Sequence, residues 1–326
     1  MSNKIMVTGG AGFIGSHLIS RLLDEGYEVH NFDILPLSKA LRLEKIKSHR
    51  NFYYTEGDLR DKSKIIDWYQ KDASQLFHLA SVVGVQNYIN DPLALIDIVV
   101  GGTRNLLELA AINQTRVLFT STSEVYGKNP NTPWAESFDR VLGPTSVDRW
   151  SYSSSKAVCE HMLFALGRSS NLEFTIVRFF NVYGPGQAPI FVVSKSIYNA
   201  MNKKPPLIYD SGKQTRCFTY VGDAIEGVFR ASRSRNTLSE VINIGSNVET
   251  KMSDLVKNII DLSGNNLEPE TFYTKERYGK SYEDIPRRIP QVEKAKELLN
   301  WEAKTDINKG IIFCMDWAKE NPWWLR

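Results

Sequence analysis

The chain has 326 residues, of which 42% are hydrophobic, 24% charged and 11% aromatic. This is the composition of a globular protein with a large core, and it excludes a disordered, collagen-like or coiled-coil chain. Lys and Arg number 40 against 37 Asp and Glu, so the net charge is only +3. Without a basic stripe interleaved with aromatic residues, that charge does not indicate binding to nucleic acid.

The cysteines and the N-terminus indicate the cellular compartment of the protein. Cys159, Cys217 and Cys314 are far apart in the sequence, and neither they nor the five histidines have the spacing of a metal site. Such sparse thiols are typical of a reducing compartment. The first residues run directly into a strand pattern, and no apolar run reaches the roughly 18 residues that a membrane span needs. We therefore expect a cytoplasmic protein with no bound metal and no membrane segment.

Short apolar runs alternate with amphipathic stretches through the first half of the chain. The expected strands are 5–7, 28–32, 52–54, 75–79 and 116–119, and the expected helices are 13–24, 62–70 and 92–113. Strands that alternate with helices imply crossover connections and a parallel sheet with helices on both faces. The pattern predicts an α/β protein with a doubly wound parallel sheet, the Rossmann fold.

The second half is more often interrupted by Pro and Gly. Its expected elements are the helices 151–169, 192–202, 223–232, 253–262 and 292–300 and the strands 172–180 and 241–244. We expect a dinucleotide-binding domain over residues 1–180, to which the chain returns near 217–245. Residues 181–326 are then a smaller, mixed α/β lobe that closes over a ligand.

A glycine-rich turn lies between the first expected strand and the first expected helix. Gly9, Gly12 and Gly15 are spaced GxxGxxG, and Phe13 and Ile14 open the helix between them. Gly9 permits the tight turn, Gly12 lets the backbone approach a pyrophosphate at the positive end of the helix dipole, and Gly15 allows close packing of helix and sheet. The turn therefore predicts a dinucleotide site.

An acidic residue at the end of the second strand indicates which dinucleotide binds. Asp33 follows Gly15 by 18 residues, close to the ~20 that separate the glycines from a ribose-binding carboxylate. Such a carboxylate would repel a 2′-phosphate, so NAD is favoured over NADP. The remaining expected contacts to the cofactor are Asp58 and Leu59 beside the adenine, and Leu79, Ala80 and Ser81 at the end of the fourth strand.

A Tyr and a Lys are placed for acid–base chemistry. Tyr152 and Lys156 are four residues apart and share one face of the expected helix. A nearby ammonium favours the phenolate and lowers the pKa of the Tyr, so Tyr152 can act as a base and Lys156 can also hold the cofactor ribose. Thr122, Ser123 and Glu124 follow the fifth strand, where such sheets bind ligands. Thr122 can bind a substrate hydroxyl, and Glu124 is either a second acid or base or a purely structural acid.

Together these motifs resemble the extended short-chain dehydrogenase/reductase family, and the similarity covers nearly the whole chain, including 178–185 and 298–302. The resemblance implies an NAD-dependent enzyme that acts on a nucleotide-diphosphate sugar through a 4-keto intermediate, with UDP as the expected nucleotide. It also implies substrate contacts by Asn181, Arg216 and Gln187. The family's members are usually homodimers joined through the helix of Tyr152, here with Val158, Met162, Leu163, Ala165 and Leu166 as apolar residues.

Within the family, Ser123 and Glu124 are most similar to the pair in the UDP-glucuronate decarboxylases. The stretches 141–144, 149–152, 212–218 and 278–284 favour the same group. Decarboxylation of UDP-glucuronate is therefore the first expectation, with Arg216 orienting the carboxylate or binding only phosphate.

Two departures from the family pattern stand out. The loop Gly186 to Phe191 lacks the basic residue usual in these decarboxylases, which leaves the glucuronate substrate open. Val99 stands where most of the family has Asn, which concerns the local helix and solvent architecture more than the type of reaction. A C4-epimerase is the second expectation and a sugar 4,6-dehydratase the third. A catalytically silent NAD-binding sensor is a distant fourth, because such a protein would have lost the Tyr–Lys pair.

Overall fold

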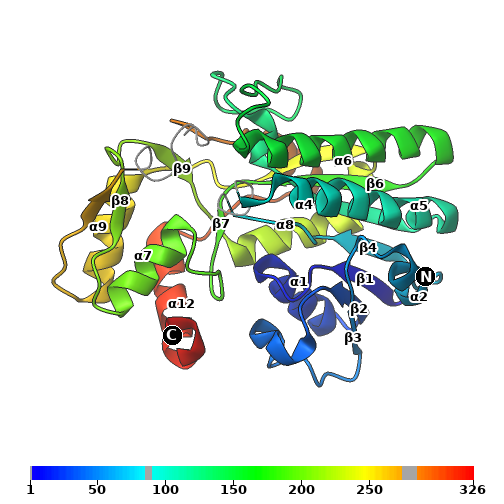
Figure 1. Ribbon diagram of the computed structural model, residues 1–326, viewed down its shortest axis with the longest axis horizontal. Coiled ribbons are helices and arrows are strands. Elements are labelled where there is room, and N and C mark those ends of the chain that lie inside the picture. The colour runs from blue at the N-terminus through cyan, green and yellow to red at the C-terminus, as the bar shows by residue number, and fades with distance from the viewer. Residues whose placement is uncertain (1, 85–89, 274–284) are drawn as a thin grey trace. The chain divides into compact units, whose positions relative to one another are not determined.

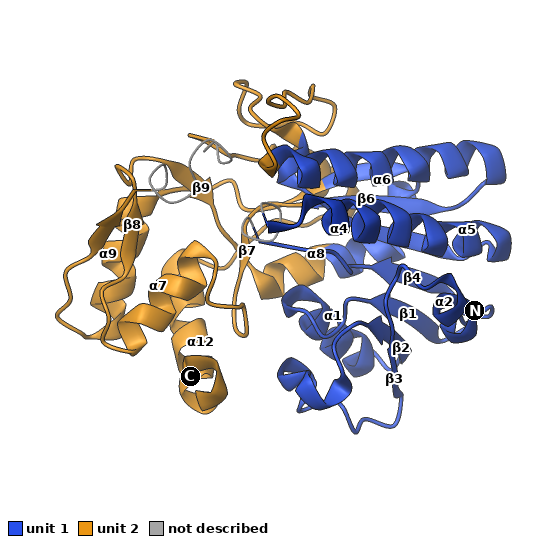
Figure 2. Ribbon diagram, in the orientation of Figure 1, with its two compact units in different colours: residues 1–125, 150–178, 228–242 blue, residues 126–149, 179–227, 243–326 orange. Residues whose placement is uncertain are grey.

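The computed structural model describes residues 2–84, 90–273 and 285–326 (Figure 1). The pattern of internal contacts divides the chain into two compact units, which Figure 2 colours separately. The first unit contains residues 1–125, 150–178 and 228–242, and the second contains 126–149, 179–227 and 243–326. The chain passes between the units several times: residues 126–149 and 179–227 leave the first unit, and residues 150–178 and 228–242 return to it. The expected domain boundary near residue 180 stays a prediction.

The first unit is built on one large sheet, which confirms the predicted fold class. Within the described residues, seven strands follow the order β11-β6-β5-β4-β1-β2-β3. Their bounds are β1 Lys4–Thr8, β2 Glu28–Asp33, β3 Phe52–Glu56, β4 Gln75–His78, β5 Arg116–Thr122, β6 Phe174–Phe179 and β11 Glu240–Ile244. The pairings from β5 through β4, β1 and β2 to β3 are parallel. The strand order changes direction between β1 and β4, and ligands of such sheets bind at the carboxyl ends there.

Helices cover both faces of this sheet (Figure 1). On one face, α2 (Lys62–Trp68), α5 (Thr103–Asn113) and α6 (Arg149–Ser170) bury apolar side chains in one core cluster with the strands. On the other face, α1 (Phe13–Asp24) meets α8 (Val221–Arg233), where the Arg21 guanidinium lies 4.4 Å from the centre of the Phe229 ring.

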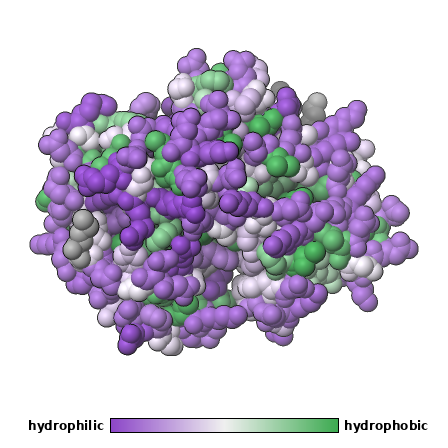
Figure 3. All heavy atoms as spheres, turned by 180° about the vertical axis from the view of Figure 1, so that it is seen from behind, coloured by the Kyte–Doolittle hydropathy of each residue, from purple (hydrophilic) through white to green (hydrophobic). Residues whose placement is uncertain are grey.

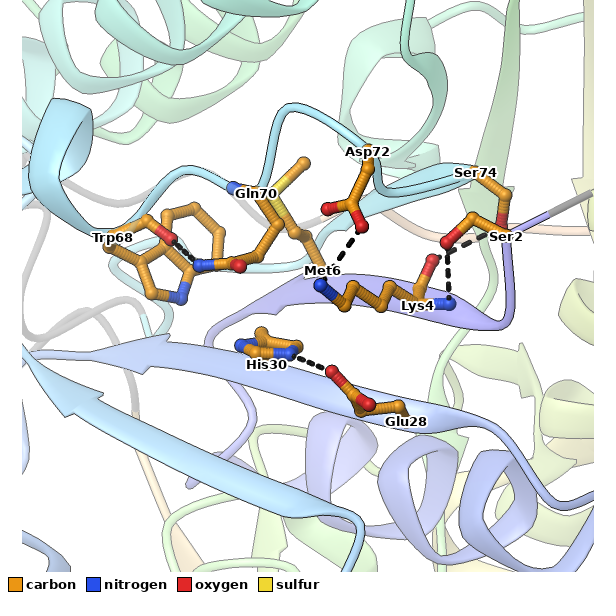
Figure 4. Close-up of polar contacts among 9 residues, drawn as sticks. All are labelled: Ser2, Lys4, Met6, Glu28, His30, Trp68, Gln70, Asp72 and Ser74. Carbon is orange, nitrogen blue, oxygen red and sulfur yellow. Dashed lines mark hydrogen bonds and ion pairs between the residues drawn. The ribbon is translucent and has the colours of Figure 1, made fainter.

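The amino-terminal ends of the strands are fixed by pairs of side chains (Figure 4). Lys4 of β1 forms an ion pair with Asp72 at 2.9 Å, and Glu28 lies 2.7 Å from His30 within β2. The His30 ring stacks on Tyr53 of β3 with a centroid distance of 4.6 Å. This end of the sheet is therefore occupied by structural contacts, while the residues expected to bind ligands follow the carboxyl ends.

The helix expected over 92–113 is interrupted. It begins as α4 (Pro92–Ile96), passes through a π-helical turn, η3 (Asp97–Gly102), and continues as α5. A Cβ on Gly102 would lie 2.7 Å from the Leu59 Cβ, so this close packing requires glycine. The carbonyl of Val99, inside the π turn, accepts a hydrogen bond from the Cys159 thiol at 3.3 Å. Such turns are local departures from α-helical pairing that are frequent at functional sites.

The second unit has a separate core. Its helices are α7 (Val192–Met201), α9 (Met252–Ser263), α11 (Glu293–Leu299) and α12 (Ile307–Glu320), and its short strands are β7 (Val182–Tyr183), β8 (Leu207–Tyr209), β9 (Thr215–Cys217), β10 (Thr219–Tyr220), β12 (Glu249–Lys251) and β13 (Glu270–Phe272). These strands form the pairs β10–β7, β12–β9 and β13–β8. Apolar side chains of α7, α9 and α12 pack together, and the buried Trp324 joins them. The C-terminal tryptophans therefore serve packing, as their clustering indicates.

Among residues 2–84, 90–273 and 285–326, no helix is long and apolar enough to cross a membrane. The same residues contain no group of three His, Cys, Asp or Glu side chains that could hold a metal ion. Hydrophilic side chains cover most of the face in Figure 3, and hydrophobic ones gather there in several smaller areas. Cys159, Cys217 and Cys314 are buried, free thiols.

Candidate active site

The glycine turn after β1 is held by backbone packing. Gly9 has a φ of +78°, and a Cβ there would lie 2.6 Å from the backbone nitrogen of Ala80. A Cβ on Gly15 would lie 2.2 Å from the Gly9 carbonyl oxygen. Gly12 is the N-cap of α1, and the single neighbour of its Cβ position would be the Gly9 oxygen at 3.1 Å. The turn therefore leaves the positive end of α1 open to a pyrophosphate, as an NAD site requires.

Asp33 lies against this turn, at the end of β2. Its carboxylate accepts hydrogen bonds from the backbone N–H of Ala11 at 2.8 Å and of Leu35 at 3.0 Å. Burial raises the pKa of Asp33, and these backbone donors lower it in part. A carboxylate has about four lone-pair sites, so acceptor capacity remains for a ribose hydroxyl beside the backbone donors of Ala11, Leu35 and Ile34. The neighbouring Asn31 was not expected in the site, but its Oδ1 accepts from the Gly10 N–H at 2.9 Å and fixes the turn.

Asp58 and Leu59 follow β3. The Asp58 carboxylate is paired with Arg60 at 2.6 Å, which lowers its pKa, and Leu59 is buried against Gly102. Their expected contact with an adenine stays a prediction.

A buried histidine connects the ends of β1 and β4 to α5. The two ring nitrogens of His78 lie 2.7 Å from Thr8 Oγ1 and 2.8 Å from Thr103 Oγ1. Burial lowers the pKa of His78 to about 3, so the ring is neutral at physiological pH. Leu79 and Ala80 donate their N–H groups to Thr8, which places them directly beside Gly9. The sequence pattern placed these residues near the cofactor but did not indicate the bridging role of His78.

Tyr152 is buried at the carboxyl end of β5. Its phenol forms hydrogen bonds with Ser81 and Thr122, so the structure brings these three predicted site residues together. Burial raises the pKa of Tyr152, the charge of Glu124 raises it further, and the two hydroxyls lower it in part. The sequence led us to expect a lowered pKa. In the polypeptide alone the direction is the opposite, because removing the phenolate from water outweighs the hydroxyl contacts.

Lys156 lies one turn along α6 from Tyr152. Its ammonium donates a hydrogen bond to the Thr120 carbonyl at 2.9 Å and lies 4.6 Å from the centre of the Phe119 ring. Burial lowers the pKa of Lys156 to about 8, while Cys159 and Glu160 raise it in part. The ammonium is therefore poised to change its charge near physiological pH, which is typical of functional lysines.

The predicted residues after Thr122 form a tight turn. Ser123 is buried and begins the 3₁₀ turn η4 (Ser123–Tyr126), in which the Glu124 N–H donates to Thr122 Oγ1 at 3.2 Å. Glu124 is half-buried and acts electrostatically on Tyr152. The sequence indicated this grouping because all three residues follow one strand end.

The predicted substrate residues lie in the second unit. Asn181, with a φ of +37°, donates from Nδ2 to the Cys217 carbonyl at 3.3 Å and so lies beside the half-buried Arg216. The side chain of Gln187 is buried and donates to the Val182 carbonyl at 2.8 Å. Its substrate contact stays a prediction, and the stretch 278–284 lies outside the described residues.

A dinucleotide fold with a Thr–Tyr–Lys group between β5 and α6 defines an enzyme of the short-chain dehydrogenase type. Residues 6–312 match the family model described as GDP-mannose 4,6 dehydratase, and the chain belongs to that family. The UDP-N-acetyl-alpha-D-glucosaminuronate decarboxylase of Bacillus cytotoxicus is 34% identical over 98% of this chain and 99% of its own.

The solved structures that are similar to this chain include two from the genus Bacillus that contain NAD. One is the UDP-glucuronic acid 4-epimerase of Bacillus cereus with UDP-glucuronic acid and NAD (27% identity, TM-score 0.86). The other is the dTDP-glucose 4,6-dehydratase of Bacillus anthracis with NAD (26%, TM-score 0.84). They match 98% and 99% of this chain, respectively, and each is covered over 99% of its own length. The predictions of the extended family, of an enzyme and of NAD as cofactor are confirmed.

Proposed function

We propose that the protein is an NAD-dependent decarboxylase of a UDP-linked hexuronate. UDP-glucuronate is the substrate that the sequence predicts. The relative at 34% identity is named for the N-acetylamino sugar acid, which makes UDP-N-acetylglucosaminuronate the natural second substrate to test.

The side chains of the first unit suit such a reaction. Bound NAD supplies the hydride acceptor for oxidation at C4 of the sugar. Tyr152 removes the proton from the 4-hydroxyl, Thr122 binds the same hydroxyl, and the Lys156 ammonium stabilises the phenolate. The resulting 4-keto acid loses its carboxylate as CO₂ because the ketone takes up the electron pair, and Glu124 and Ser123 then assist protonation at C5. Asn181, Arg216 and Gln187 bind the substrate, with Arg216 orienting the carboxylate.

The observation that carries this proposal is the acid beside the base. Glu124 lies close enough to Tyr152 for its charge to raise the pKa of the phenol. A simple epimerase has no use for a second acid or base there, since C4 alone reacts, whereas a decarboxylase must return a proton to C5.

A C4-epimerase is the second candidate, because the loop from Gly186 to Phe191 offers no basic residue for a sugar carboxylate. The change Glu124→Gln distinguishes a decarboxylase from a C4-epimerase. It would slow a decarboxylase roughly 100-fold, which is the usual contribution of one acid–base group, and leave an epimerase nearly intact.

The deciding experiment is a mass spectrum of the products after incubation with NAD⁺ and either UDP-glucuronate or UDP-N-acetylglucosaminuronate. Loss of the mass of CO₂ supports the proposal and identifies the sugar. An unchanged mass with a new C4 epimer in the NMR spectrum would instead support the epimerase.

We also propose a cytoplasmic homodimer joined through α5 and α6. Val158 is 43% exposed on α6, and Leu93 and Ile112 are exposed on α4 and α5, whereas Leu163 belongs to the core. Light scattering on the purified protein, with Val158→Asp as the variant, tests this interface.

A further inference from the structure

A buried ion pair lies behind the Tyr–Lys pair and takes no part in the chemistry proposed above. The Arg178 guanidinium of β6 donates two hydrogen bonds to the Glu160 carboxylate of α6, from Nε to Oε1 at 3.0 Å and from Nη2 to Oε2 at 2.6 Å. Their side chains are only 8% and 7% exposed. Ser121 of β5 donates to the same carboxylate at 2.5 Å. Glu160 therefore connects α6 to both strands beneath it.

The contacts between β5 and α6 follow a regular pattern. Tyr152, Lys156 and Glu160 are four residues apart and lie along one stripe of the helix. Three consecutive residues of β5 meet this stripe: Thr122 contacts Tyr152, the Thr120 carbonyl accepts from Lys156, and Ser121 donates to Glu160. Of these contacts, the one between Ser121 and Glu160 is reinforced, because Glu160 also forms the ion pair with Arg178 of a second strand.

We propose that Glu160, clamped by Arg178 and Ser121, is a positioning residue that fixes the Tyr152–Lys156 face of α6 against β5 and places a carboxylate one helical turn from the Lys156 ammonium. The proposal rests on the proposed function only in the experiment that measures turnover.

The electrostatic part follows from the groups that act on Lys156. Cys159 and Glu160 act from its own helix and His78 acts from β4, while Thr120 and Phe119 of β5 do not titrate. Burial keeps His78 neutral and raises the pKa of Cys159, so the latter remains a thiol. The Glu160 carboxylate, held in the ion pair with Arg178, opposes the loss of the Lys156 proton that burial promotes, while the Arg178 guanidinium of the same pair acts in the opposite sense.

The test is the pH profile of Glu160→Gln, which keeps the size and hydrogen-bonding capacity of the side chain but removes its charge. In the pH profile of kcat, the decline at high pH reflects deprotonation of Lys156. We expect this alkaline limb to shift about one pH unit lower, with KM little changed. Turnover above pH 8 would then fall roughly tenfold. The matched control is Arg116→Gln, which removes a part-buried guanidinium that bonds to the Ala231 and Ser234 carbonyls from the other end of β5. It should lower the Tm but leave the alkaline limb unchanged.

A second readout does not depend on turnover. In protein labelled with ¹³C at the lysine Cε, the resonance of Lys156, assigned by its absence in Lys156→Arg, reports the ammonium directly. Its titration should move to lower pH in Glu160→Gln and stay in place in Arg116→Gln. If the wild type turns over no nucleotide sugar, the proposed function fails while this titration still decides the role of Glu160.

An unchanged titration and an unchanged limb in Glu160→Gln would overturn the proposal and leave the ion pair a purely structural feature. If that variant does not fold, Glu160→Met with Arg178→Met replaces it, because buried ion pairs are often exchanged for apolar pairs without loss of stability. The same downward movement, smaller because Arg178 is also removed, is expected there, and its absence would equally refute the role.

Discussion

The glycine turn and the β5–α6 edge prepare the first unit for ligands in opposite ways. At the turn, Gly9 and Gly15 bring backbone so close to backbone that a methyl group has no room. At the β5–α6 edge, the long side chains of Tyr152, Lys156 and Glu160 are buried and oriented by hydrogen bonds to β5. The turn is shaped by close backbone packing around its glycines, and the β5–α6 edge holds buried ionisable side chains whose pKa values burial shifts.

This difference has a practical consequence for mutations. A change at the turn acts on the shape of the backbone, so it affects folding and cofactor binding together. A change at the β5–α6 edge can leave the fold in place and alter only the charge or proton that the reaction uses. Substitutions in the two regions can test this division.

Replacing Tyr152 with Phe tests the β5–α6 edge most directly. Loss of the phenolic oxygen should lower kcat by about 10²- to 10⁴-fold, the usual contribution of a general base. The Kd for NAD, measured by fluorescence titration, should change little. The matched control is Tyr198→Phe, because the Tyr198 hydroxyl bonds to the Arg326 carbonyl on the surface of the second unit. Turnover close to wild type in the Tyr152 variant would refute its role as the base.

Replacing Gly9 with Ala tests the turn. Ala must adopt the positive φ and also place its Cβ 2.6 Å from the Ala80 nitrogen, so we expect a loss of about 2–4 kcal/mol in the free energy of unfolding. Gly26→Ala is the control, since Gly26 has a φ of +84° but no atom within 4 Å of its Cβ position. It should cost only about 1 kcal/mol in urea unfolding. Equal losses in the free energy of unfolding of the two variants would mean that the contact with Ala80 does not contribute to the cost.

Replacing Asp33 with Asn tests whether the turn also recognises charge. The amide has one acceptor oxygen in place of two and carries no charge, so the affinity for NAD should fall roughly 10- to 100-fold by calorimetry. Discrimination against NADP should weaken as well. Asp61→Asn is the control, because Asp61 caps α2 and Asn caps helices equally well. An unchanged affinity for NAD in the Asp33 variant would remove Asp33 from the site.

Replacing Glu249 with Gln tests how little an exposed ion pair contributes to stability, for comparison with the buried ion pair of Glu160 and Arg178. Arg287 lowers the pKa of Glu249 from 4.5 to about 2 through a forked hydrogen bond. A lowered pKa stabilises the folded protein above pH 4.5, and this stabilisation is lost as the pH falls from 4.5 towards 2. The variant should therefore lower the Tm by at most about 2 °C at pH 7. The difference should disappear near pH 2, and a large effect at pH 7 would show that the pair matters more than its exposure suggests.

Local sequence patterns were enough to predict the alternation of strands and helices, the glycine turn, Asp33 and the Tyr152–Lys156 spacing. Each of these is a local pattern whose meaning depends on neighbours along the chain. The positions of Thr122, Ser123 and Glu124 were equally predictable, because carboxyl ends of parallel strands share one edge of the sheet.

The side-chain contacts between distant elements could not be predicted from the sequence. The bridge from Thr8 through His78 to Thr103, the clamp of Arg178 on Glu160 and the interrupted helix at Val99 each join segments that are distant in the sequence. The direction of the Tyr152 and Lys156 pKa shifts could not be predicted either, because burial, which sets both, is a property of the packed protein and not of the residue spacing.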